Sequence, residues 1–313
     1  MNQPLAIDGA IGGVVRLDHL GVLRASGADA ATFLQSQLTN DVVSLEGGAA
    51  RLAGYCSAKG RLQASFIVWR PSPDEFLLAC AADLLPATLK RLSMFVLRAR
   101  CRLSDASAEI PLSGLVGPSV PAGADWSRFD ADGATTIVLP KAAGTRRALV
   151  AGHPPQGAAM AAETWRWLDV QSGVPLIVAA TVDRFVPQMA NFELLRGVDF
   201  KKGCYPGQEI VARSQYRGTI KRRMFLFDVD AAAQPGDEVF HDADPGQPAG
   251  MVVNGAPRPD GRGSSALVEV KLAALERGSL HLGSTEGAPL RRAPLPYAVP
   301  VEGAETSGTP SVA

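Results

Sequence analysis

The stretch from Lys202 to Glu209, with the sequence KGCYPGQE, restricts the local fold more than any other part of the chain. Gly203 and Gly207 accept backbone angles that other residues avoid, so the chain can turn sharply here and press its amides against a ligand. Pro206 suits the first turn of a helix, and Gly218 can end that helix. The sequence therefore predicts a tight loop that leads into a short helix.

Cys204 stands just before this helix, next to Lys201 and Lys202. The partial positive charge of a helix N-terminus and the nearby ammonium groups favour thiolate over thiol, and the thiolate is the nucleophilic form of cysteine. The alternative is a buried cysteine that serves as a small apolar side chain. Because the flanking residues are cationic or glycine rather than apolar, we expect Cys204 to be a reactive thiolate assisted by Lys202.

The other cysteines, Cys56, Cys80 and Cys101, show no Cys-x-x-Cys spacing, and the four histidines are scattered. We therefore expect no metal site built by a local motif. The first residues lack a basic segment before an apolar core, and no apolar run reaches the length of a membrane span. These features predict a cytoplasmic protein with free thiols and no membrane association.

The N-terminal two thirds of the chain alternate between strand and helix patterns. Ser26 and Asp29 fit a capping box ahead of a helix, and Asp83 can cap a second one. Trp165 falls on the apolar stripe of a third helix, so we expect it in the core. Strands packed against helices predict an α+β layer of ferredoxin-like character. The expected strands are 51–56, 61–69, 75–81, 101–103, 135–139 and 146–151, and the third helix is expected over 157–171.

The sequence changes character after Lys221. Short apolar stretches separated by Pro-Gly, Asn-Gly and Asp-Gly pairs are typical of a small antiparallel barrel. A domain boundary is therefore expected near residues 218–223, and residues 300–313 have too little to bury to be ordered. The apolar stretches are 223–229, 237–240, 249–253 and 265–272.

Three stretches carry a resemblance to a known family. The first is residues 201–209 with the Val-Ala-Arg that ends at Arg213, the second is FLQSQLTNDV at 33–42, and the third is Phe-Val-Pro-Gln at 185–188 with Asn191. Together they resemble the YgfZ family of folate-binding proteins, which are relatives of the glycine cleavage T-protein, an aminomethyltransferase. The resemblance extends over most of the chain and is strongest at these three places.

The resemblance implies a fold and a ligand. The fold is α+β and T-protein-like, with two interleaved α/β subdomains in residues 1–220 and a C-terminal antiparallel β-barrel in residues 221–299 around a central folate pocket. Tetrahydrofolate or another reduced folate is expected to bind between the first helix and the loop before Cys204. The residues that the resemblance brings to this pocket are Asn40, Asp41, Gln188, Asn191, Lys202, Gln208, Glu209 and Arg213.

A missing carboxylate separates two possible functions. The T-protein carries an aspartate beside the reacting folate nitrogen, in the hairpin after its N-terminal helix. The matching stretch here is 55–65, and no acidic residue occurs from Gly47 to Pro73, so that general acid or base is absent. The resemblance then implies a folate-binding accessory protein that supports assembly, repair or maintenance of iron–sulfur enzymes, including tRNA-modifying ones, through Cys204. The alternative is a folate-dependent aminomethyl transferase that uses Cys204 or a water in place of the aspartate.

A basic cluster is the last notable feature. Residues 201–223 hold seven cations against the single acid Glu209, a local net charge of +6 in a chain whose formal net charge is zero. A solvated basic face is one explanation. The others are a site for the folate glutamate tail and direct tRNA contact through Lys221, Arg222 and Arg223. Aromatic residues that could stack on bases within this stretch are limited to Tyr205 and Tyr216.

Overall fold

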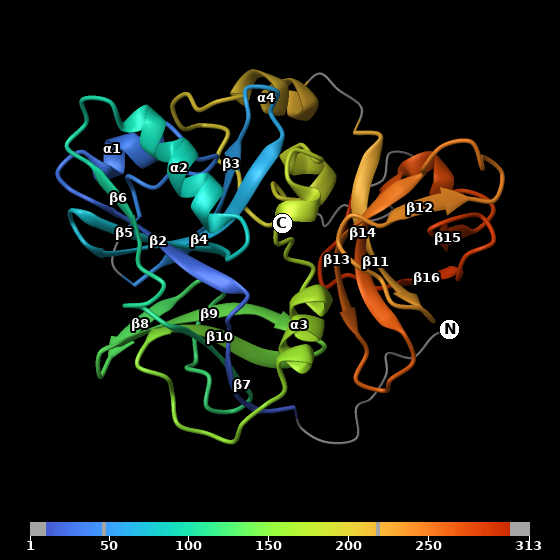
Figure 1. Ribbon diagram of the computed structural model, residues 1–313, viewed down its shortest axis with the longest axis horizontal. Helices are drawn as coiled ribbons and strands as arrows, with labels where there is room; N and C mark the ends of the chain where they lie inside the picture. The colour runs from blue at the N-terminus through green and yellow to red at the C-terminus, as the bar shows by residue number, and fades with distance from the viewer. Residues whose placement is uncertain (1–10, 46–47, 217–219, 301–313) are drawn as a thin grey trace, which may run out of the picture.

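The computed structural model describes residues 11–45, 48–216 and 220–300, which form three antiparallel sheets (Figure 1). Four α-helices and three 3-10 helices connect the strands in these ranges. All of the expected tail after Pro300 lies outside the described residues. Within the described ranges, no helix has the length and apolarity needed to cross a membrane.

The first sheet has the strand order β3-β4-β5-β2-β6. Helices α1 (Ala30–Gln35) and α2 (Leu85–Val96) lie side by side over one of its faces (Figure 1), where Phe33, Leu92 and Phe66 share one buried cluster. The predicted hairpin with a third strand and two covering helices is confirmed. The strands are β2 (Leu20–Ser26), β3 (Ala50–Cys56), β4 (Leu62–Ser72), β5 (Glu75–Ala81) and β6 (Arg102–Asp105).

The starts of both helices differ from the prediction. The Asp29 carboxylate accepts a hydrogen bond from the Arg100 backbone N–H at 2.8 Å, so no capping box forms at α1. The Asp83 carboxylate accepts the N–H of Ala179 at 3.0 Å, and Leu84 is the N-cap of α2. In both cases a carboxylate that could cap its own helix binds a backbone N–H of a segment distant in sequence instead. Arg100 and Ala179 supply these N–H groups.

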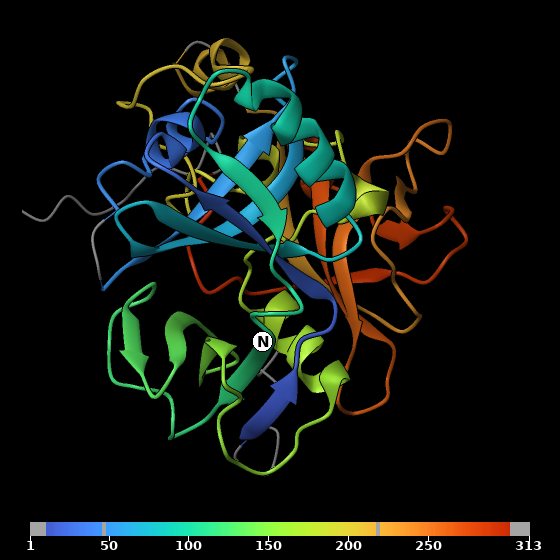
Figure 2. The ribbon, with the colours of Figure 1, turned by 60° about the vertical axis from the view of Figure 1, so that its left-hand side comes forward.

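The second sheet has the order β1-β7-β10-β9-β8. Because β1 precedes β2, the described part of the chain first contributes a strand to the second sheet, then builds the first sheet and returns to complete the second (Figure 2). The two sheets are therefore interleaved in the sequence. The strands are β1 (Gly13–Arg16), β7 (Leu112–Val116), β8 (Arg128–Ala131), β9 (Ala134–Ala142) and β10 (Thr145–Gly152).

Helix α3 (Ala162–Gln171) lies between the second sheet and the third (Figure 1). Trp165 is fully buried, and any side chain at Gly114 of β7 would overlap its indole, so the predicted core role of Trp165 is confirmed. The helix begins later than expected because the preceding residues run alongside β1. There the Val14 N–H donates to the Ala158 carbonyl at 2.8 Å.

The third sheet has the order β15-β12-β13-β14-β11-β16 and curls into a half-barrel (Figure 1). The predicted α+β fold with a C-terminal antiparallel barrel is confirmed in this form. The strands are β11 (Arg222–Val229), β12 (Glu238–His241), β13 (Gly250–Pro257), β14 (Ser264–Lys271), β15 (Leu280–Leu282) and β16 (Leu290–Ala293). The remaining helices are η1 (Ala179–Thr181), η2 (Pro187–Ala190), α4 (Gln208–Tyr216) and η3 (Leu272–Leu275).

Candidate functional site

Two glycines allow the loop before α4 to pack closely against the tip of the β3–β4 hairpin. Gly207 has φ +76°, and a Cβ there would lie 2.5 Å from the Gly60 nitrogen and closer still to the Ser57 carbonyl oxygen. Gly60 itself has φ +68°, and its Cβ would lie 2.8 Å from Cβ of Ile210 in α4. Only glycine allows the two backbones to approach this closely in these conformations.

Gly203 does not share this constraint. A Cβ at Gly203 would meet no atom within 4 Å, and its φ lies outside the left-handed region. The stretch Lys202–Glu209 is called the signature from here on. The expectation that both of its glycines force the turn is wrong for Gly203. The sharp turn depends on Gly207, because backbone atoms of the hairpin press against it.

Lys202 ties the same loop to α1. Its Nζ donates to the carbonyl oxygens of Gln35 and Leu38, both at 2.5 Å, and lies 5.3 Å from the ring centre of Tyr205. An ammonium group suits the carbonyl end of a helix, where the partial charge is negative. Burial lowers the pKa of Lys202 to about 8, although the negative charges of Asp41 and Asp199 act in the opposite direction. The sequence placed this side chain beside Cys204 but could not show that its hydrogen bonds go to α1.

Cys204 is exposed on the surface between these two ties. Cys56 and Cys80 are buried, and burial raises the pKa of each thiol to about 12. Cys101 is half-buried, and burial raises its pKa as well. Cys204 is thus the accessible thiol of the protein. No three His, Cys, Asp or Glu side chains gather as metal ligands in the part of the chain that the structure describes.

Asn40 and Asp41 organise the segment after α1. Asn40 Nδ2 donates to the carbonyls of Leu52 and Arg196, each at 2.7 Å, and joins this segment to β3 and to the chain before the signature loop. Burial raises the pKa of Asp41, but hydrogen bonds from Ser44 and the nearby charge of Arg51 outweigh it and hold that pKa below its usual value. Both residues have a clear structural task, and their predicted contact with folate stays a prediction.

Gln188 and Asn191 are fully buried and also bind backbone groups. Gln188 Nε2 donates to the Val211 carbonyl of α4 at 2.8 Å, and Asn191 Nδ2 donates to the Met224 carbonyl of β11 at 2.7 Å. Asn191 has φ +56°, which asparagine tolerates better than most residues. These two amides therefore join the 3-10 helix η2 to α4 and to the third sheet.

The remaining residues of the signature lie on α4 itself. Gln208 is half-buried in its first turn, whereas Glu209 and Arg213 are exposed. Of the expected tRNA contacts, Arg222 pairs with the buried Glu269. Arg223 is itself buried and pairs with Glu193. Strand β11 turns both arginines towards buried carboxylates, and their predicted contact with tRNA stays a prediction.

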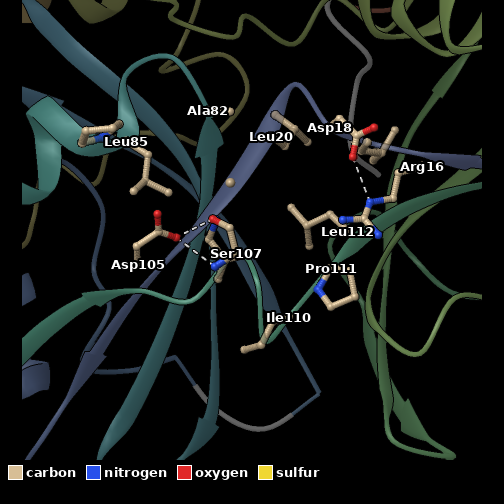
Figure 3. A pocket seen from close by; sticks show the side chains of 14 residues that line it. Arg16, Asp18, Leu20, Ala82, Leu85, Asp105, Ser107, Ile110, Pro111 and Leu112 are labelled. Atoms are coloured by element: carbon tan, nitrogen blue, oxygen red, sulfur yellow. Dashed lines mark hydrogen bonds and ion pairs between the residues drawn. The ribbon is translucent and has the colours of Figure 1, made fainter.

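Two cavities lie elsewhere in the molecule, and neither is lined by any of the eight predicted folate residues. The larger is an open groove of about 280 Å³ beside β2 and the start of α2 (Figure 3). Its polar side chains pair with each other, since Ser107 Oγ donates to Asp105 Oδ1 at 2.6 Å and Arg16 Nε donates to Asp18 Oδ1 at 2.9 Å (Figure 3). One oxygen of each carboxylate in the groove is therefore occupied by a neighbouring side chain.

The smaller cavity, about 70 Å³, lies between the first and second sheets and α3, and we call it the central cavity. The segment 174–176, which also lines it, is bound to the third sheet, because Asn254 Oδ1 accepts the Leu176 N–H at 2.9 Å. All three sheets thus meet near this cavity. Its other lining residues include Leu20, Ser65, Trp126, Arg147, Trp165 and Asp169.

The polar groups of the central cavity are incompletely paired. Arg147 is buried, stacks over Trp165 at 5.4 Å, and pairs with Oδ1 of Asp169. The other oxygen, Oδ2, lies 3.8 Å from His19 Nε2, too far for a hydrogen bond. Trp165 Nε1 is buried with no hydrogen-bond partner among the described residues. Sequence reasoning missed this site because it identified Trp165 only as core and gave no role to Asp169.

The structure also brings a carboxylate to the acid-free hairpin. Asp183, in the segment between η1 and η2, accepts hydrogen bonds at 2.9 Å from Ser57 Oγ and Gln63 Nε2. It has φ +61° and is exposed. A distant segment therefore supplies the acidic group that the hairpin lacks in sequence, although Asp183 lines neither of the two cavities.

Comparison with known proteins places these features in a family. A family model described as the GCVT N-terminal domain matches residues 11–122. The structure is similar to that of a glycine cleavage system aminomethyltransferase T from Bartonella henselae, with a TM-score of 0.70 over 90% of this chain and 85% of that chain. Because the two are 16% identical, this likeness shows the fold alone.

Relatives at higher identity cover most of the chain. An uncharacterized protein of Haemophilus influenzae is 30% identical over 72% of this chain and 77% of its own. A protein of Edwardsiella ictaluri named tRNA-modifying protein YgfZ is 31% identical over 74% of this chain and 76% of its own. The protein of that name from Sodalis glossinidius is 30% identical over 91% of this chain and 93% of its own. With this coverage, and with the aminomethyltransferase fold described above, the chain belongs to the YgfZ family.

Proposed function

We propose that this protein is a reduced-folate-binding accessory protein that supports tRNA modification, with Cys204 as its reactive group. Its role is to help maintain the iron–sulfur enzymes that modify tRNA. The observation that carries the proposal is the exposed thiol of Cys204 on a loop tied down at both ends. The relatives named tRNA-modifying protein YgfZ support the link to tRNA.

The two ties fix the position of the thiol. Ordering a backbone residue costs about 1–2 kcal/mol, so an exposed loop is held in one conformation only where contacts offset this cost. Here Lys202 and Gly207 provide those contacts on either side of Cys204. A partner protein would therefore meet the thiol at a defined place on the surface, as attack on a disulfide or contact with a cluster requires.

The central cavity has the chemistry that a reduced folate needs. The pterin ring is flat and carries an amide N–H next to an amino group, two donors that a carboxylate can accept together. Oδ1 of Asp169 stays with Arg147, so Oδ2 is the oxygen that can accept from one of these donors, and Trp126 and Trp165 offer flat walls. At about 70 Å³ the cavity holds only a few waters, so a pterin enters only when the partly buried side chains of Leu20 and Trp126 move outward.

Calorimetry with tetrahydrofolate tests the ligand and its place. The wild type should bind, Asp169→Asn should bind at least about tenfold more weakly because one acceptor becomes a donor, and Arg213→Gln should bind like the wild type. A thermal melt of Asp169→Asn shows whether loss of the Arg147 pair has unfolded the protein. Absence of heat in the wild type would contradict folate binding. Loss of binding in Arg213→Gln, with normal binding in Asp169→Asn, would indicate that the folate binds at α4 and not in the central cavity.

Complementation of a deletion strain tests the role of the thiol. Cys204→Ala should leave stability unchanged, since an exposed side chain contributes little to the core, but it should lower tRNA methylthiolation by iron–sulfur enzymes. Cys101→Ala, at matched protein level, is the control for removal of a thiol. Full rescue by Cys204→Ala would show that the thiol is not needed and that the signature serves only as a structural turn.

The alternative, a folate-dependent aminomethyl transferase, is favoured by one observation, the placement of Asp183 against the hairpin. An exposed carboxylate with two hydrogen bonds could serve as a general base. The transferase requires turnover of an aminomethyl donor with tetrahydrofolate, and Asp183→Asn should abolish it. Purified protein that binds folate without turnover would leave the accessory role.

A further inference from the structure

We infer that the outer face of α4, the loop of residues 199–205 and the tip of the β3–β4 hairpin together bind a single-stranded segment of RNA. We call this surface the α4 face. The inference rests on the proposed role in tRNA modification and assigns a substrate contact to a surface near Cys204. This surface does not use the arginines of β11 that the sequence suggested for tRNA contact, because Arg222 forms an ion pair with Glu269 and Arg223 forms one with Glu193.

The α4 face is assembled from three segments that touch each other. The hairpin tip meets the first turn of α4 through Gly60, Gly207 and Ile210. The loop lies along the other end of the helix, where the ring centres of Phe200 and Tyr216 are 5.8 Å apart. Figure 1 shows α4 on the outside of the molecule with the hairpin tip beside it.

Positive charge is concentrated around this face. The segments 57–62, 183–205, 208–216 and 220–223 carry eight cations against Asp183, Asp199 and Glu209 once the ion pairs of Arg222 with Glu269 and of Arg223 with Glu193 are set aside. The local net charge is +5 in a chain whose formal net charge is zero. Such a concentration attracts phosphate by releasing the counterions of the nucleic acid.

The cations nearest to α4 are available for binding. Lys59 at the hairpin tip, Lys201 in the loop and Arg213 on the helix are all exposed. None of them takes part in an ion pair with another described residue. Lys59 precedes Gly60, which meets the first turn of α4, whereas Lys201 follows Phe200, which contacts Tyr216 at the other end, and Arg213 lies in the last turn of the helix. The three cations therefore belong to segments at both ends of α4.

An exposed aromatic ring makes RNA a better fit than an acidic peptide. Tyr216 is 70% exposed, and Phe200 meets its ring at an interplanar angle of 71°, which holds the ring in place while leaving surface free. Unstacked bases of RNA loops bind to aromatic side chains of this kind, with cations on the backbone beside them. An acidic peptide would use the cations but has no flat group for the tyrosine.

Fluorescence anisotropy with an unmodified tRNA transcript over a series of salt concentrations tests the surface. Each phosphate contact on a single strand contributes about 0.7 to the slope of log K against log salt, so Lys201→Gln with Arg213→Gln should lower the slope by about 1.4. The control double variant, Lys90→Gln with Arg98→Gln, removes two exposed cations from and beside α2 and should leave the slope unchanged. Equal losses in both double variants would show a general charge effect and overturn the inference.

Variants of Tyr216 distinguish the contribution of base stacking to RNA affinity from the contribution of charge. Loss of one stacked base is expected to weaken binding by about 5- to 150-fold in Tyr216→Ser, whereas Tyr216→Phe should keep it. Absence of tRNA binding at low salt, or displacement of tRNA by poly-glutamate as readily as by unlabelled tRNA, would overturn the inference. The second result would indicate an acidic protein partner. Folate calorimetry and Cys204 complementation do not depend on this assay, so failure here is distinguishable from failure of the proposed function.

Discussion

Gly207→Ala should destabilise the protein more than an alanine at any neighbouring glycine of the signature. At φ +76° an alanine is in the left-handed region, which costs a non-glycine residue about 1–2 kcal/mol. The new Cβ would also lie 2.5 and 2.6 Å from the N and Cα atoms of Gly60, so backbone rather than a flexible side chain must move. Overpacking of this kind adds about 1–3 kcal/mol. We expect a total loss of about 2–5 kcal/mol in the free energy of unfolding.

Two other glycines separate the cost of the left-handed backbone conformation from the cost of overpacking. Gly144 has φ +75° with nothing within 4 Å of its Cβ position, so Gly144→Ala reports the backbone cost alone, about 1–2 kcal/mol. Gly203 has open space and no positive φ, so Gly203→Ala should change stability by less than about 0.5 kcal/mol. Urea unfolding of the three variants measures all of these values. Equal stability of the Gly207 and Gly144 variants would refute the argument that the hairpin and the loop are interlocked.

Three further predictions concern titration and burial. Cys204 should react with a limiting alkylating reagent before the buried cysteines of β3 and β5, whose pKa values burial raises to about 12, and equal labelling in peptide mapping would contradict this. Lys202 should titrate near pH 8 by NMR in the folded protein. Because the unfolded state then binds more protons at this side chain between pH 8 and about 10.5, the difference in the free energy of unfolding between the wild type and Lys202→Met should rise with pH across that window; the buried thiols of Cys56 and Cys80, whose raised pKa values act in the opposite direction, are common to both proteins and cancel in the difference. Arg223→Met should cost about 3–5 kcal/mol in urea unfolding because it leaves Glu193 buried without its partner, and adding Glu193→Gln should recover much of the loss, whereas simple additivity would show that the pair does not act as a unit.

Periodicity predicted the longer elements of the fold because their patterns are local. The hairpin β3–β4, helix α2 and strands β11 to β14 each carry enough alternation or helical spacing to be found without tertiary information. Strands β1, β2, β7, β8, β15 and β16 were missed. Most of them are short, and β1 and β16 pair with partners about 100 and 60 residues away, so their structure depends on contacts that no local pattern records.

The residue types of the site were predictable, but their tasks were not. The signature indicated a loop, a helix and an exposed thiol, and all three are present. Lys202 contacts the end of α1 across more than 160 residues of sequence, and Asp183 contacts the hairpin across 120 and 126 residues. The partly unpaired groups of the central cavity are likewise visible only when β10 and α3 are packed together.

The contact between Gly60 and Gly207 has a consequence for any attempt to move or evolve the signature. Both positions already carry the smallest side chain, so a substitution at one cannot be compensated by a smaller residue at the other. The octapeptide grafted onto another scaffold would lack the hairpin that fills the opposite half of the contact. In a randomised library the two positions should therefore be retained as a pair, while Gly203 between them drifts freely, and the smallest transplantable unit is the signature together with residues 50–72 rather than the signature itself.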